Sequence, residues 1–352
     1  MQDPATIAIH ADDALTELPD VAPAIRPATT FARGDGGRVY RRESHETTER
    51  LEAVLGALDG GHAVAYPSGM AAAASLLRRL SPRLISLPHD VYHGVRALVL
   101  QGAAERAWGV SEPGGLAAGD VWWVETPSNP RCLVTDVAAV ASDARSRGVC
   151  VVVDSTFATP VLLRPLALGA DAVVHSSTKF IAGHSDAMGG AVVCSDPGLA
   201  DSLRIRRTVD GSVPGSLDTW LTLRGVRTLP LRVERQSATA SAVAQWLVGR
   251  VPRVWYPGLA DHPGHDVAAA QMAGFGGIVS FEVADAAAAR RVVGGLRLFT
   301  VATSLGGVES LAEHRAVVDP EAPPGLIRLS IGLEASGDLI GDLEAALAGA
   351  VA

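Results

Sequence analysis

The sequence is poor in aromatic residues and cysteine, and it lacks any long uncharged apolar run. Aromatic residues make up 5% of the 352 positions, and the three cysteines are spaced neither as a metal site nor as a disulfide framework. We therefore expect buried free thiols at Cys132, Cys150 and Cys194. No stretch of about 18 or more uncharged apolar residues is present, so a membrane-spanning helix is not expected.

Basic charge is also scarce. The chain has 30 Lys and Arg against 38 Asp and Glu, a formal net charge of -8. This balance argues against nucleic acid or an anionic membrane as a partner. The first residues, Met1–Pro4, show neither a basic region nor the apolar segment of a secretory signal, so we expect a cytoplasmic protein. With 48% apolar residues, the chain can bury a substantial core.

Strand-like and helix-like patterns alternate from residue 46 onward. Alternation of this kind predicts an α/β fold with a mostly parallel sheet and helices on both faces, and we assign it to a large domain of residues 46–235. Helical spacing of apolar residues is found at 47–58, 70–80, 94–102 and 137–147, and β-branched or apolar runs at 63–66, 84–87, 121–125, 149–154 and 172–176.

The two ends of the chain differ from this middle part. Residues 1–45 are rich in Pro, Asp and Gly and have little periodicity, which predicts an arm without a core of its own. A single long helical pattern over about 216–248 leads into a smaller C-terminal domain, residues 236–352. Its strands are expected to be short and antiparallel, at 254–256, 277–282, 296–300 and 326–331, before a closing helix at 340–348.

Asp154 and Lys179 follow two neighbouring strand-like runs. The carboxyl ends of parallel strands are where open α/β sheets bind ligands, and lysine is rarely buried there unless it does chemistry or is paired. The hydroxyl residues Ser176 and Thr178 immediately precede the lysine. A lysine for a Schiff base, an aspartate for a protonated pyridine nitrogen and hydroxyls for a phosphate together indicate pyridoxal phosphate.

Other segments could complete such a site. Ser68-Gly69-Met70 stands where a strand becomes a helix, and free N–H groups there favour a phosphate, although an ordinary serine N-cap has the same pattern. Asn129, in the turn Glu125–Pro130, could contact the ring hydroxyl of the cofactor or belong to a plain proline-rich connection. Tyr92 could stack on a flat cofactor.

Two signals concern ions. His89 and His93 lie four residues apart, as metal ligands on a helix do, but they fall in a predicted strand-to-helix loop without a third ligand, so we expect no metal. Arg328 is a lone charge in the apolar run Leu326–Ile331. A buried arginine needs an anion, which a substrate carboxylate or a structural salt bridge could provide.

Taken together, the ordered motifs resemble the Cys/Met-metabolism family of pyridoxal-phosphate enzymes, which includes cystathionine γ-synthase and cystathionine γ-lyase. The resemblance covers nearly the whole chain. It implies fold type I, the aspartate-aminotransferase-like fold, with a large domain around a mostly parallel sheet and a smaller α+β C-terminal domain. The matching segments are Tyr40–Arg42, Ser68–Met70, Glu125–Pro130, Val153–Pro160, His175–Asp186, Ser304–Ser310 and Ile327–Ser330.

The resemblance also implies roles for the matched residues. Lys179 would form the Schiff base and then move protons, Asp154 would pair with the pyridinium, and Tyr92 would stack on the ring. Arg328 would bind the α-carboxylate of a small amino-acid substrate. The remaining contacts would come from Ser68, Gly69, Met70, Ser176 and Thr178 to the phosphate, and from Asn129, Thr303 and Ser304 to the cofactor or substrate.

A shared active site is a further implication. Tyr40 and Arg42 would reach the phosphate bound by a neighbouring subunit, which would explain an arm without a core. We therefore expect a homodimer whose subunits share their active sites, usually paired into a tetramer.

Departures from the family pattern concern substrate choice. The family's usual Gly-Asn-Pro-Thr is replaced by Ser44–Thr47, and Thr303 stands where γ-acting members often have glutamate. The stretch His314–Pro324 is shorter than usual. The short stretch and the threonine resemble a subgroup labelled cystathionine γ-lyase, so we expect γ-elimination on L-cystathionine to give cysteine, ammonia and 2-oxobutanoate.

Several alternatives stay open. Cystathionine γ-synthase, which joins O-succinyl- or O-acetylhomoserine to cysteine by γ-replacement, would use the same residues, and a β-lyase is a further possibility. Methionine γ-lyase is disfavoured because His93-Gly94 stands where that group has a cysteine. A non-catalytic protein or an enzyme retuned for a secondary-metabolite amino acid is a separate class, which intact Lys179, Asp154 and Arg328 argue against. Gly274–Gly277 does not match the dinucleotide-binding motif, which argues against a nicotinamide oxidoreductase.

Overall fold

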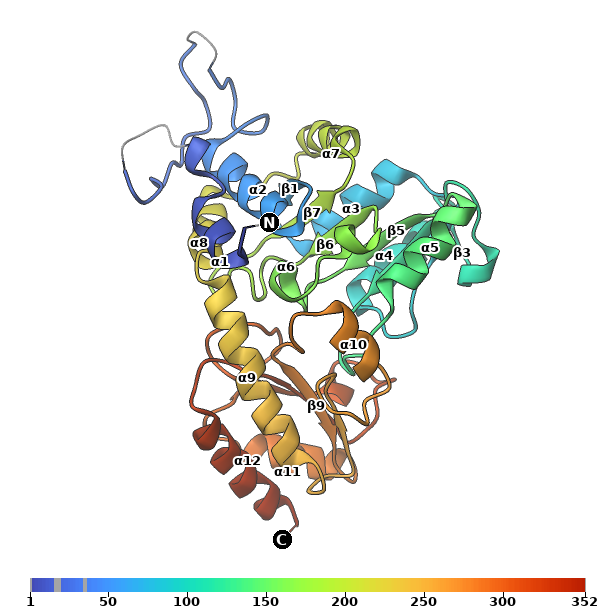
Figure 1. Ribbon diagram of the computed structural model, residues 1–352, viewed down its shortest axis with the longest axis vertical. Helices are drawn as coiled ribbons and strands as arrows, with labels where there is room; N and C mark the ends of the chain where they lie inside the picture. The colour runs from blue at the N-terminus through green and yellow to red at the C-terminus, as the bar shows by residue number, and fades with distance from the viewer. Residues whose placement is uncertain (1, 16–19, 34–36, 352) are drawn as a thin grey trace.

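The computed structural model describes residues 2–15, 20–33 and 37–351, and it is built around two β-sheets joined by a long helix (Figure 1). Residues 16–19 and 34–36 of the predicted arm lie outside the described residues. In Figure 1 the larger sheet and its helices occupy the upper part of the molecule, and the smaller sheet lies below.

The larger sheet has, within the described residues, seven strands in the order β1-β7-β6-β5-β4-β2-β3. The predicted parallel arrangement is present for its central strands, and one strand that the sequence prediction missed, β7, runs antiparallel to both of its neighbours. The strands are β1 (His62–Tyr66), β2 (Leu84–Ser86), β3 (Gly109–Val110), β4 (Val121–Glu125), β5 (Cys150–Asp154), β6 (Ala172–His175) and β7 (Gly190–Cys194).

Helices cover both faces of this sheet, as predicted. Val151, Val152 and Val153 in β5 are all buried, because each face of the strand meets a helical layer, and this produces its continuous apolar run. One layer consists of α3 (Gly69–Leu80), α4 (His93–Ala104) and α7 (Pro197–Asp210), and the other of α2 (Glu46–Asp59), α5 (Val137–Arg147), α6 (Thr159–Leu162) and α8 (Ser216–Val226).

The long helix predicted for 216–248 is two helices, which corrects the prediction. Helix α8 ends at Val226, and α9 (Leu229–Leu247) begins after a two-residue break. Pro230 lies in the first turn of α9. It has no N–H to donate to the carbonyl of Val226, so the first helix cannot continue through it. Helix α9 connects the two sheets, and the domain boundary predicted between residues 235 and 236 falls inside it (Figure 1).

The smaller sheet has, in the described part of the chain, the order β10-β11-β12-β9-β8. Its pairings are antiparallel as expected, except that β10 is parallel to β11. The sequence prediction missed β11 and α11, and its strand at 296–300 overlaps β10 only at Thr300. The elements are β8 (Arg253–Trp255), α10 (His265–Gln271), β9 (Ile278–Glu282), α11 (Ala286–Gly295), β10 (Thr300–Val301), β11 (Leu311–His314), β12 (Leu326–Ser330) and α12 (Ser336–Val351).

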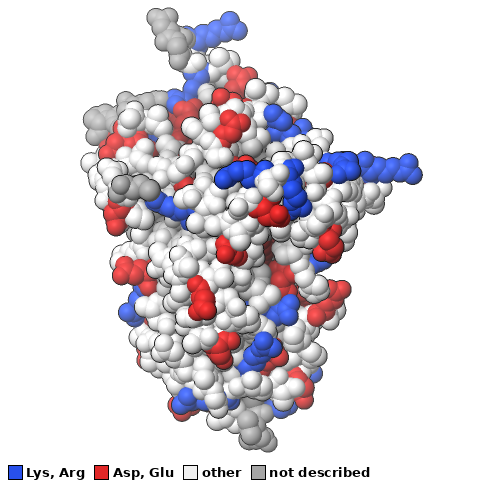
Figure 2. Space-filling model, turned by 45° about the vertical axis from the view of Figure 1, so that its right-hand side comes forward, with Lys and Arg blue, Asp and Glu red and all other residues white. Residues whose placement is uncertain are grey.

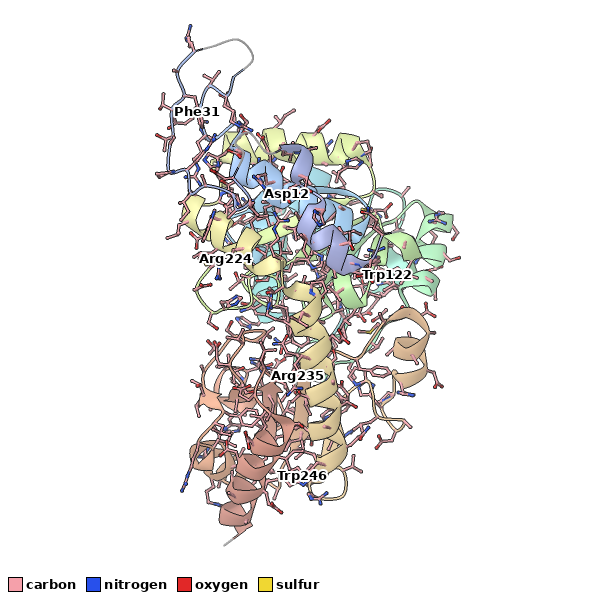
Figure 3. The ribbon with its side chains drawn as sticks, turned by 60° about the vertical axis from the view of Figure 1, so that its left-hand side comes forward. Asp12, Phe31, Trp122, Arg224, Arg235 and Trp246 are labelled. Atoms are coloured by element: carbon pink, nitrogen blue, oxygen red, sulfur yellow. The ribbon has the colours of Figure 1, made fainter. Side chains whose placement is uncertain are left out.

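The first residues of the predicted arm have no core of their own and pack on the body of the protein. Ile7 and Ala8 of α1 (Pro4–His10) are buried against α2 and α9 (Figure 3). Asp12 is fully buried and accepts a hydrogen bond of 2.7 Å from Nε of Arg50. The chain around Phe31, by contrast, extends away from the body (Figure 3).

The state of the cysteines and the distribution of surface charge are those expected from the composition. Cys132 and Cys194 are buried, Cys150 is partly buried, and all three are free thiols. Figure 2 shows Lys and Arg interspersed with Asp and Glu over one face of the molecule rather than gathered in one basic patch. None of the helices in the described ranges is both long enough and apolar enough to cross a bilayer.

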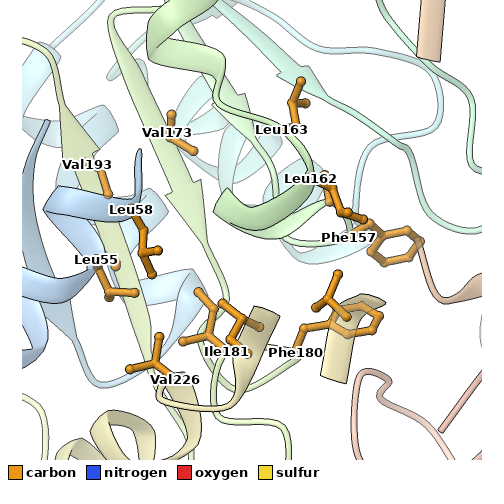
Figure 4. Packing of buried hydrophobic residues seen from close by; sticks show 14 of the residues in the cluster. Leu55, Leu58, Phe157, Leu162, Leu163, Val173, Phe180, Ile181, Val193 and Val226 are labelled. Carbon is orange, nitrogen blue, oxygen red and sulfur yellow. The ribbon is translucent and has the colours of Figure 1, made fainter. Parts of the chain in front are cut away.

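Leu58 tests the packing of α2 against the sheet. It is fully buried beside Val193 of β7 and Val226 of α8 (Figure 4). We expect Leu58→Ala to lower the free energy of unfolding by about 2–5 kcal/mol, because the cavity left behind cannot be refilled. Leu100→Ala, at a side chain that is 54% exposed, should change it by less than about 0.5 kcal/mol. Urea unfolding at one fixed protein concentration measures both; equal changes would contradict the packing.

Candidate active site

A cavity of about 760 Å³ lies between the carboxyl edge of the large sheet and the small sheet. It brings together residues that are widely separated in the chain, and all the predicted cofactor and substrate contacts except Tyr40 and Arg42 line it. These lining residues are Ser68, Gly69, Met70, Tyr92, Asn129, Asp154, Ser176, Thr178, Lys179, Thr303, Ser304 and Arg328.

Lys179 lies in a turn whose next residues are buried in the hydrophobic core. The next two residues, Phe180 and Ile181, are buried in the cluster that also contains Leu55 and Val226 (Figure 4). Arg232 of α9, itself buried, donates hydrogen bonds to the carbonyls of Phe180 (2.7 Å) and Ile181 (3.2 Å). The apolar anchors and the arginine therefore fix the backbone from which the lysine side chain enters the cavity.

The amine of Lys179 lies in an environment that disfavours its charge. Burial and then the positive charge of Arg328 lower the pKa of Lys179, against the opposing charge of Glu313. Nζ donates a hydrogen bond of 2.8 Å to Oγ of Ser304, whose backbone has a positive φ of 77°. A lysine with a lowered pKa is more often neutral, and a neutral amine is both a nucleophile and a base.

Backbone and hydroxyl donors surround one end of the cavity. Helix α3 begins at Gly69, and Ser68 Oγ caps it by accepting from the N–H of Ala71 at 3.0 Å. A Cβ atom at Gly69 would lie 2.9 Å from Cβ of Ser176, so only glycine allows this close approach. The N–H groups at the start of the helix and the Ser176 hydroxyl suit a phosphate at this end.

Two carboxylates lie side by side where the central strands end. Glu125 of β4 is paired in register with Asp154 of β5. Burial, and then the charge of Asp154, raise the pKa of Glu125 well above its usual range. Burial also raises the pKa of Asp154, against hydrogen bonds from Thr156 and the charge of His175. Both carboxylates accept hydrogen bonds, but only Asp154 also has the favourable charge of His175 for its ionised form, as suits a pyridinium counter-ion.

His175 has a carboxylate partner behind the site. Its Nε2 is 2.9 Å from Oδ2 of Asp59, and both side chains are fully buried. Burial disfavours the charged ring, but the charge and hydrogen bond of Asp59 outweigh it and raise the pKa of His175. The sequence reasoning assigned no role to either residue.

Glu125 also positions two of the predicted contacts. Its Oε2 accepts from the N–H of Tyr92 at 2.6 Å, and its Oε1 accepts from the N–H of Asn129 at 3.0 Å. The ring of Tyr92 lies over Gly94, where a Cβ would be 2.6 Å from Cε1 of the ring. Sequence reasoning quoted Glu125 only as part of its motif; a carboxylate ending a buried strand was the available signal.

Arg328 has the structural salt bridge that the sequence analysis gave as the alternative to a substrate carboxylate. It forms a salt bridge of 2.8 Å with Glu313, which faces it in register across β11 and β12. It also donates to Oδ1 of Asn129 (2.8 Å) and to the carbonyl of Ser304 (2.9 Å). Burial lowers its pKa to about 10, against the charge of Glu313. Arg328 therefore stays a cation with a donor network facing the cavity.

The sequence reasoning missed Glu313 and Arg315, which also line the cavity. Glu313 belongs to β11, the strand that the prediction overlooked, and Arg315 begins the turn that follows it. Charged residues next to an apolar pair were the only available signal, and a strand as short as β11 gives too few residues for the alternation to be recognised.

Tyr40 and Arg42 lie away from the cavity of their own chain. The guanidinium of Arg42 stacks over the Tyr40 ring at 5.4 Å, and it donates to the carbonyl of Thr208 at 3.3 Å. Tyr40 is 41% exposed. Their predicted contact with a cofactor phosphate therefore requires the active site of another subunit.

No group of three or more His, Cys, Asp or Glu side chains in the described residues is placed to hold a metal ion. The residues present fit pyridoxal phosphate instead. The helix start at Gly69 can take a phosphate, Asp154 can hold a pyridinium, and Lys179 can react with an aldehyde.

Comparison with known proteins gives a consistent picture. The model of the family described as Cys/Met metabolism PLP-dependent enzyme matches residues 116–348. Cystathionine γ-synthase of Mycobacterium tuberculosis is 42% identical, with 98% of this chain and 96% of the relative covered. Cystathionine β-lyase of Coxiella burnetii is 39% identical, with 97% of each covered. A structure described as a cystathionine γ-lyase of Micromonospora echinospora superposes with a TM-score of 0.93 at 40% identity, covering 99% of this chain and 100% of the other.

The charge of Arg328 can be tested through the reactivity of Lys179. Arg328→Met removes a positive charge that lowers the pKa of Lys179 and leaves Glu313 less neutralised. Both changes should raise that pKa and so move the midpoint of the pH dependence for pyridoxal-phosphate capture by cofactor-free protein to higher pH. Arg328→Lys should keep the midpoint near the wild-type value. An unchanged or lower midpoint in Arg328→Met would contradict the coupling.

Proposed function

The chain belongs to the family of Cys/Met metabolism PLP-dependent enzymes, and from this membership we propose that it catalyses γ-elimination on L-cystathionine, giving cysteine, ammonia and 2-oxobutanoate. Its cofactor is pyridoxal phosphate, and it is a PLP-dependent carbon–sulfur lyase of fold type I. The predicted family, fold class and cofactor are thereby confirmed. The substrate and the residue roles that follow are proposals.

The observation that carries the proposal is the joint position of Lys179 and Arg328 in one cavity. Arg328 would bind the α-carboxylate through a bidentate pair and so place Cα of the substrate near the amine of Lys179. The lowered pKa of Lys179 and its hydrogen bond to Ser304 would hold that amine ready as a base.

Lys179 would then move the protons. The bound cofactor supplies an electron sink for negative charge at Cα. Nζ of Lys179 would take the proton from Cα, pass it to a carbon of the cofactor and so become free to take one from Cβ, and the thiolate of cysteine would then leave from Cγ and be protonated. Water is consumed when ammonia is released from the remaining four-carbon fragment. Burial raises the pKa of Asp154, and the hydrogen bonds from Thr156, the charge of His175 and a bound pyridinium would favour its ionised form.

The other predicted residues would bind and orient. Tyr92, held through its N–H by Glu125, would cover one face of the ring. Asn129 would contact the cofactor or substrate beside Arg328. The phosphate would bind at Ser68, Gly69, Met70, Ser176 and Thr178, and the substrate side chain would pass Thr303 and Ser304.

Thr303 lines the cavity. Together with the short stretch His314–Pro324 it resembles the subgroup labelled cystathionine γ-lyase, and this resemblance supports elimination over replacement. The second candidate is γ-replacement, which joins O-succinyl- or O-acetylhomoserine to cysteine. The observation in its favour is the 42% identity to the mycobacterial cystathionine γ-synthase over nearly the whole chain. A β-lyase, as in the Coxiella relative, would yield pyruvate instead of 2-oxobutanoate.

Product analysis of the cofactor-loaded protein separates these reactions. With L-cystathionine alone we expect 2-oxobutanoate and cysteine, and with Lys179→Ala we expect neither, because the base that moves the protons is absent. Pyruvate would indicate the β-lyase. If the protein does not convert cystathionine but forms it from O-succinylhomoserine and cysteine, it is a cystathionine γ-synthase and our assignment is wrong.

We further propose that the active site is completed in an active-site-sharing dimer, and that two such dimers form a tetramer. Tyr40 and Arg42 do not line the cavity of their own chain, and Tyr40 is 41% exposed. They follow the segment around Phe31 that extends from the body (Figure 3). At the site of a neighbouring subunit, the guanidinium of Arg42 and the phenol of Tyr40 could both donate to the cofactor phosphate.

Mixing of inactive subunits tests the shared site. Arg42→Met should weaken cofactor phosphate binding at the neighbour's site, and Lys179→Ala should inactivate its own site. Because a mixed dimer would contain one site with an intact Lys179 and an intact arm, co-refolding the two variants should restore part of the activity. The tested alternative is an arm that acts within its own subunit, for which the mixture would be no more active than the separate variants.

A further inference from the structure

Asp59 and His175 form a buried pair behind the active-site cavity, where neither can touch a substrate. Neither residue lines the cavity. Nε2 of His175, in β6, lies 2.9 Å from Oδ2 of Asp59, in α2, and both side chains are fully buried. Charged groups are almost never fully buried unless they are paired, and a pair held away from solvent often serves a neighbouring site. We therefore ask which group this pair acts on.

Asp59 occupies a position that is unfavourable for a carboxylate. It is the last residue of α2, where the helix dipole disfavours negative charge, and Gly60 ends the helix with a φ of 81°. Its Oδ1 has no hydrogen-bond partner among the described residues, which adds to the cost of its burial. The contact that offsets these costs is the one with His175, and it favours a protonated imidazole ring.

His175 connects this carboxylate to Asp154. The residue before it, Val174, is paired in register with Asp154 on the neighbouring strand. Burial lowers the pKa of His175, but the charges of Asp59 and Asp154 outweigh burial and raise it. Burial raises the pKa of Asp154, and the charge of His175 opposes that rise. On its other side His175 is paired in register with Ala191 of β7, which carries no charge.

This arrangement bears on the position of one proton. In the cofactor-loaded protein, Asp154 would share a proton with the ring nitrogen of pyridoxal phosphate. Because Asp154 lines the cavity and His175 does not, the positive charge lies behind the carboxylate. A cation there repels the shared proton towards the ring. A protonated ring is the form that accepts electrons from the substrate.

We propose that Asp59 and His175 are positioning residues that act through Asp154, keeping it ionised and so keeping the ring nitrogen of the cofactor protonated. His175 carries the positive charge, and Asp59 maintains it. The proposal rests on the proposed function in one respect, because it takes Asp154 to be the counter-ion of the pyridinium. It does not depend on which bond the enzyme breaks.

The protonation state of the ring nitrogen can be measured directly. The protein is loaded with pyridoxal phosphate that carries ¹⁵N in the ring, and solid-state NMR distinguishes a pyridinium from a pyridine nitrogen by its chemical shift. We expect a pyridinium signal in the wild type. In Asp59→Asn and His175→Gln the signal should shift towards the pyridine position, because Asp154 then holds the proton more strongly. Asp154→Asn, which removes the counter-ion, marks the far end of that range.

Two further variants separate this role from a structural one. Asp59→Glu keeps the charge, so its signal should lie closer to that of the wild type than the signal of Asp59→Asn does. Asp120→Asn is the matched control. Asp120 is also a fully buried carboxylate, but it precedes β4 at the amino end of the strand and accepts a hydrogen bond of 3.0 Å from Arg83. Its loss should lower stability and leave the ring signal at the wild-type position.

The charge on His175 can be observed in the wild type alone. With ¹⁵N-labelled histidine, the cofactor-loaded protein should keep an imidazolium signal at about pH 8, where an exposed histidine with a pKa of about 6.5 is neutral. Burial lowers the pKa of both His45 and His262, so neither is its source. His175→Gln should remove this signal.

The remaining outcomes decide against the proposal. An unchanged ring signal in folded Asp59→Asn and His175→Gln would show a purely structural pair. A wild type without the imidazolium signal would overturn the proposal even if both variants failed to fold. Because neither measurement follows turnover, a protein that gives the expected signals but leaves cystathionine intact would refute the proposed reaction and retain the role of the pair.

Discussion

The active site depends first on how the backbone at Lys179 is held. Phe180 and Ile181 direct their side chains into the main core, and Arg232 satisfies their carbonyls from α9. A turn buried on one side and hydrogen-bonded on the other cannot shift without breaking both kinds of contact. The lysine side chain is thereby confined to the cavity, where burial and Arg328 lower its pKa. The helix that joins the two sheets thus also fixes the catalytic turn.

Neighbouring strands place two carboxylates at one buried edge, and their surroundings give them different states. Asp154 has the hydrogen bonds of Thr156 and the charge of His175, which is itself backed by Asp59. The ionised form of Glu125 is disfavoured more strongly, because burial is joined by the like charge of Asp154. The protein uses Glu125 to hold the backbone at Tyr92 and Asn129. One carboxylate is therefore available as a counter-ion, and the other organises the loops around it.

The small sheet supplies the charged end of the cavity. Pairing of β11 with β12 sets Glu313 opposite Arg328, and the turn after β11 adds Arg315 to the same carboxylate. In the proposed function, catalysis and substrate binding are divided between the two sheets. The large sheet carries the groups that would hold the cofactor and move protons, whereas the small sheet carries Arg328, which would meet the α-carboxylate of the substrate.

The sequence by itself determined the fold class, the cofactor and the family, because these follow from local features: the alternation of helix and strand patterns, and motifs such as the one around Lys179. Of the contacts that it predicted for cofactor and substrate, all except Tyr40 and Arg42 lie in the cavity. Only the tertiary structure decided that Pro230 divides the long helix, that β7 runs antiparallel between β6 and β1, and that Glu313 and Arg315 face the cavity. Short or glycine-rich strands have too little periodicity to be recognised, and a contact such as Glu313 with Arg328 depends on strand order and register, which pairing across the whole sheet sets.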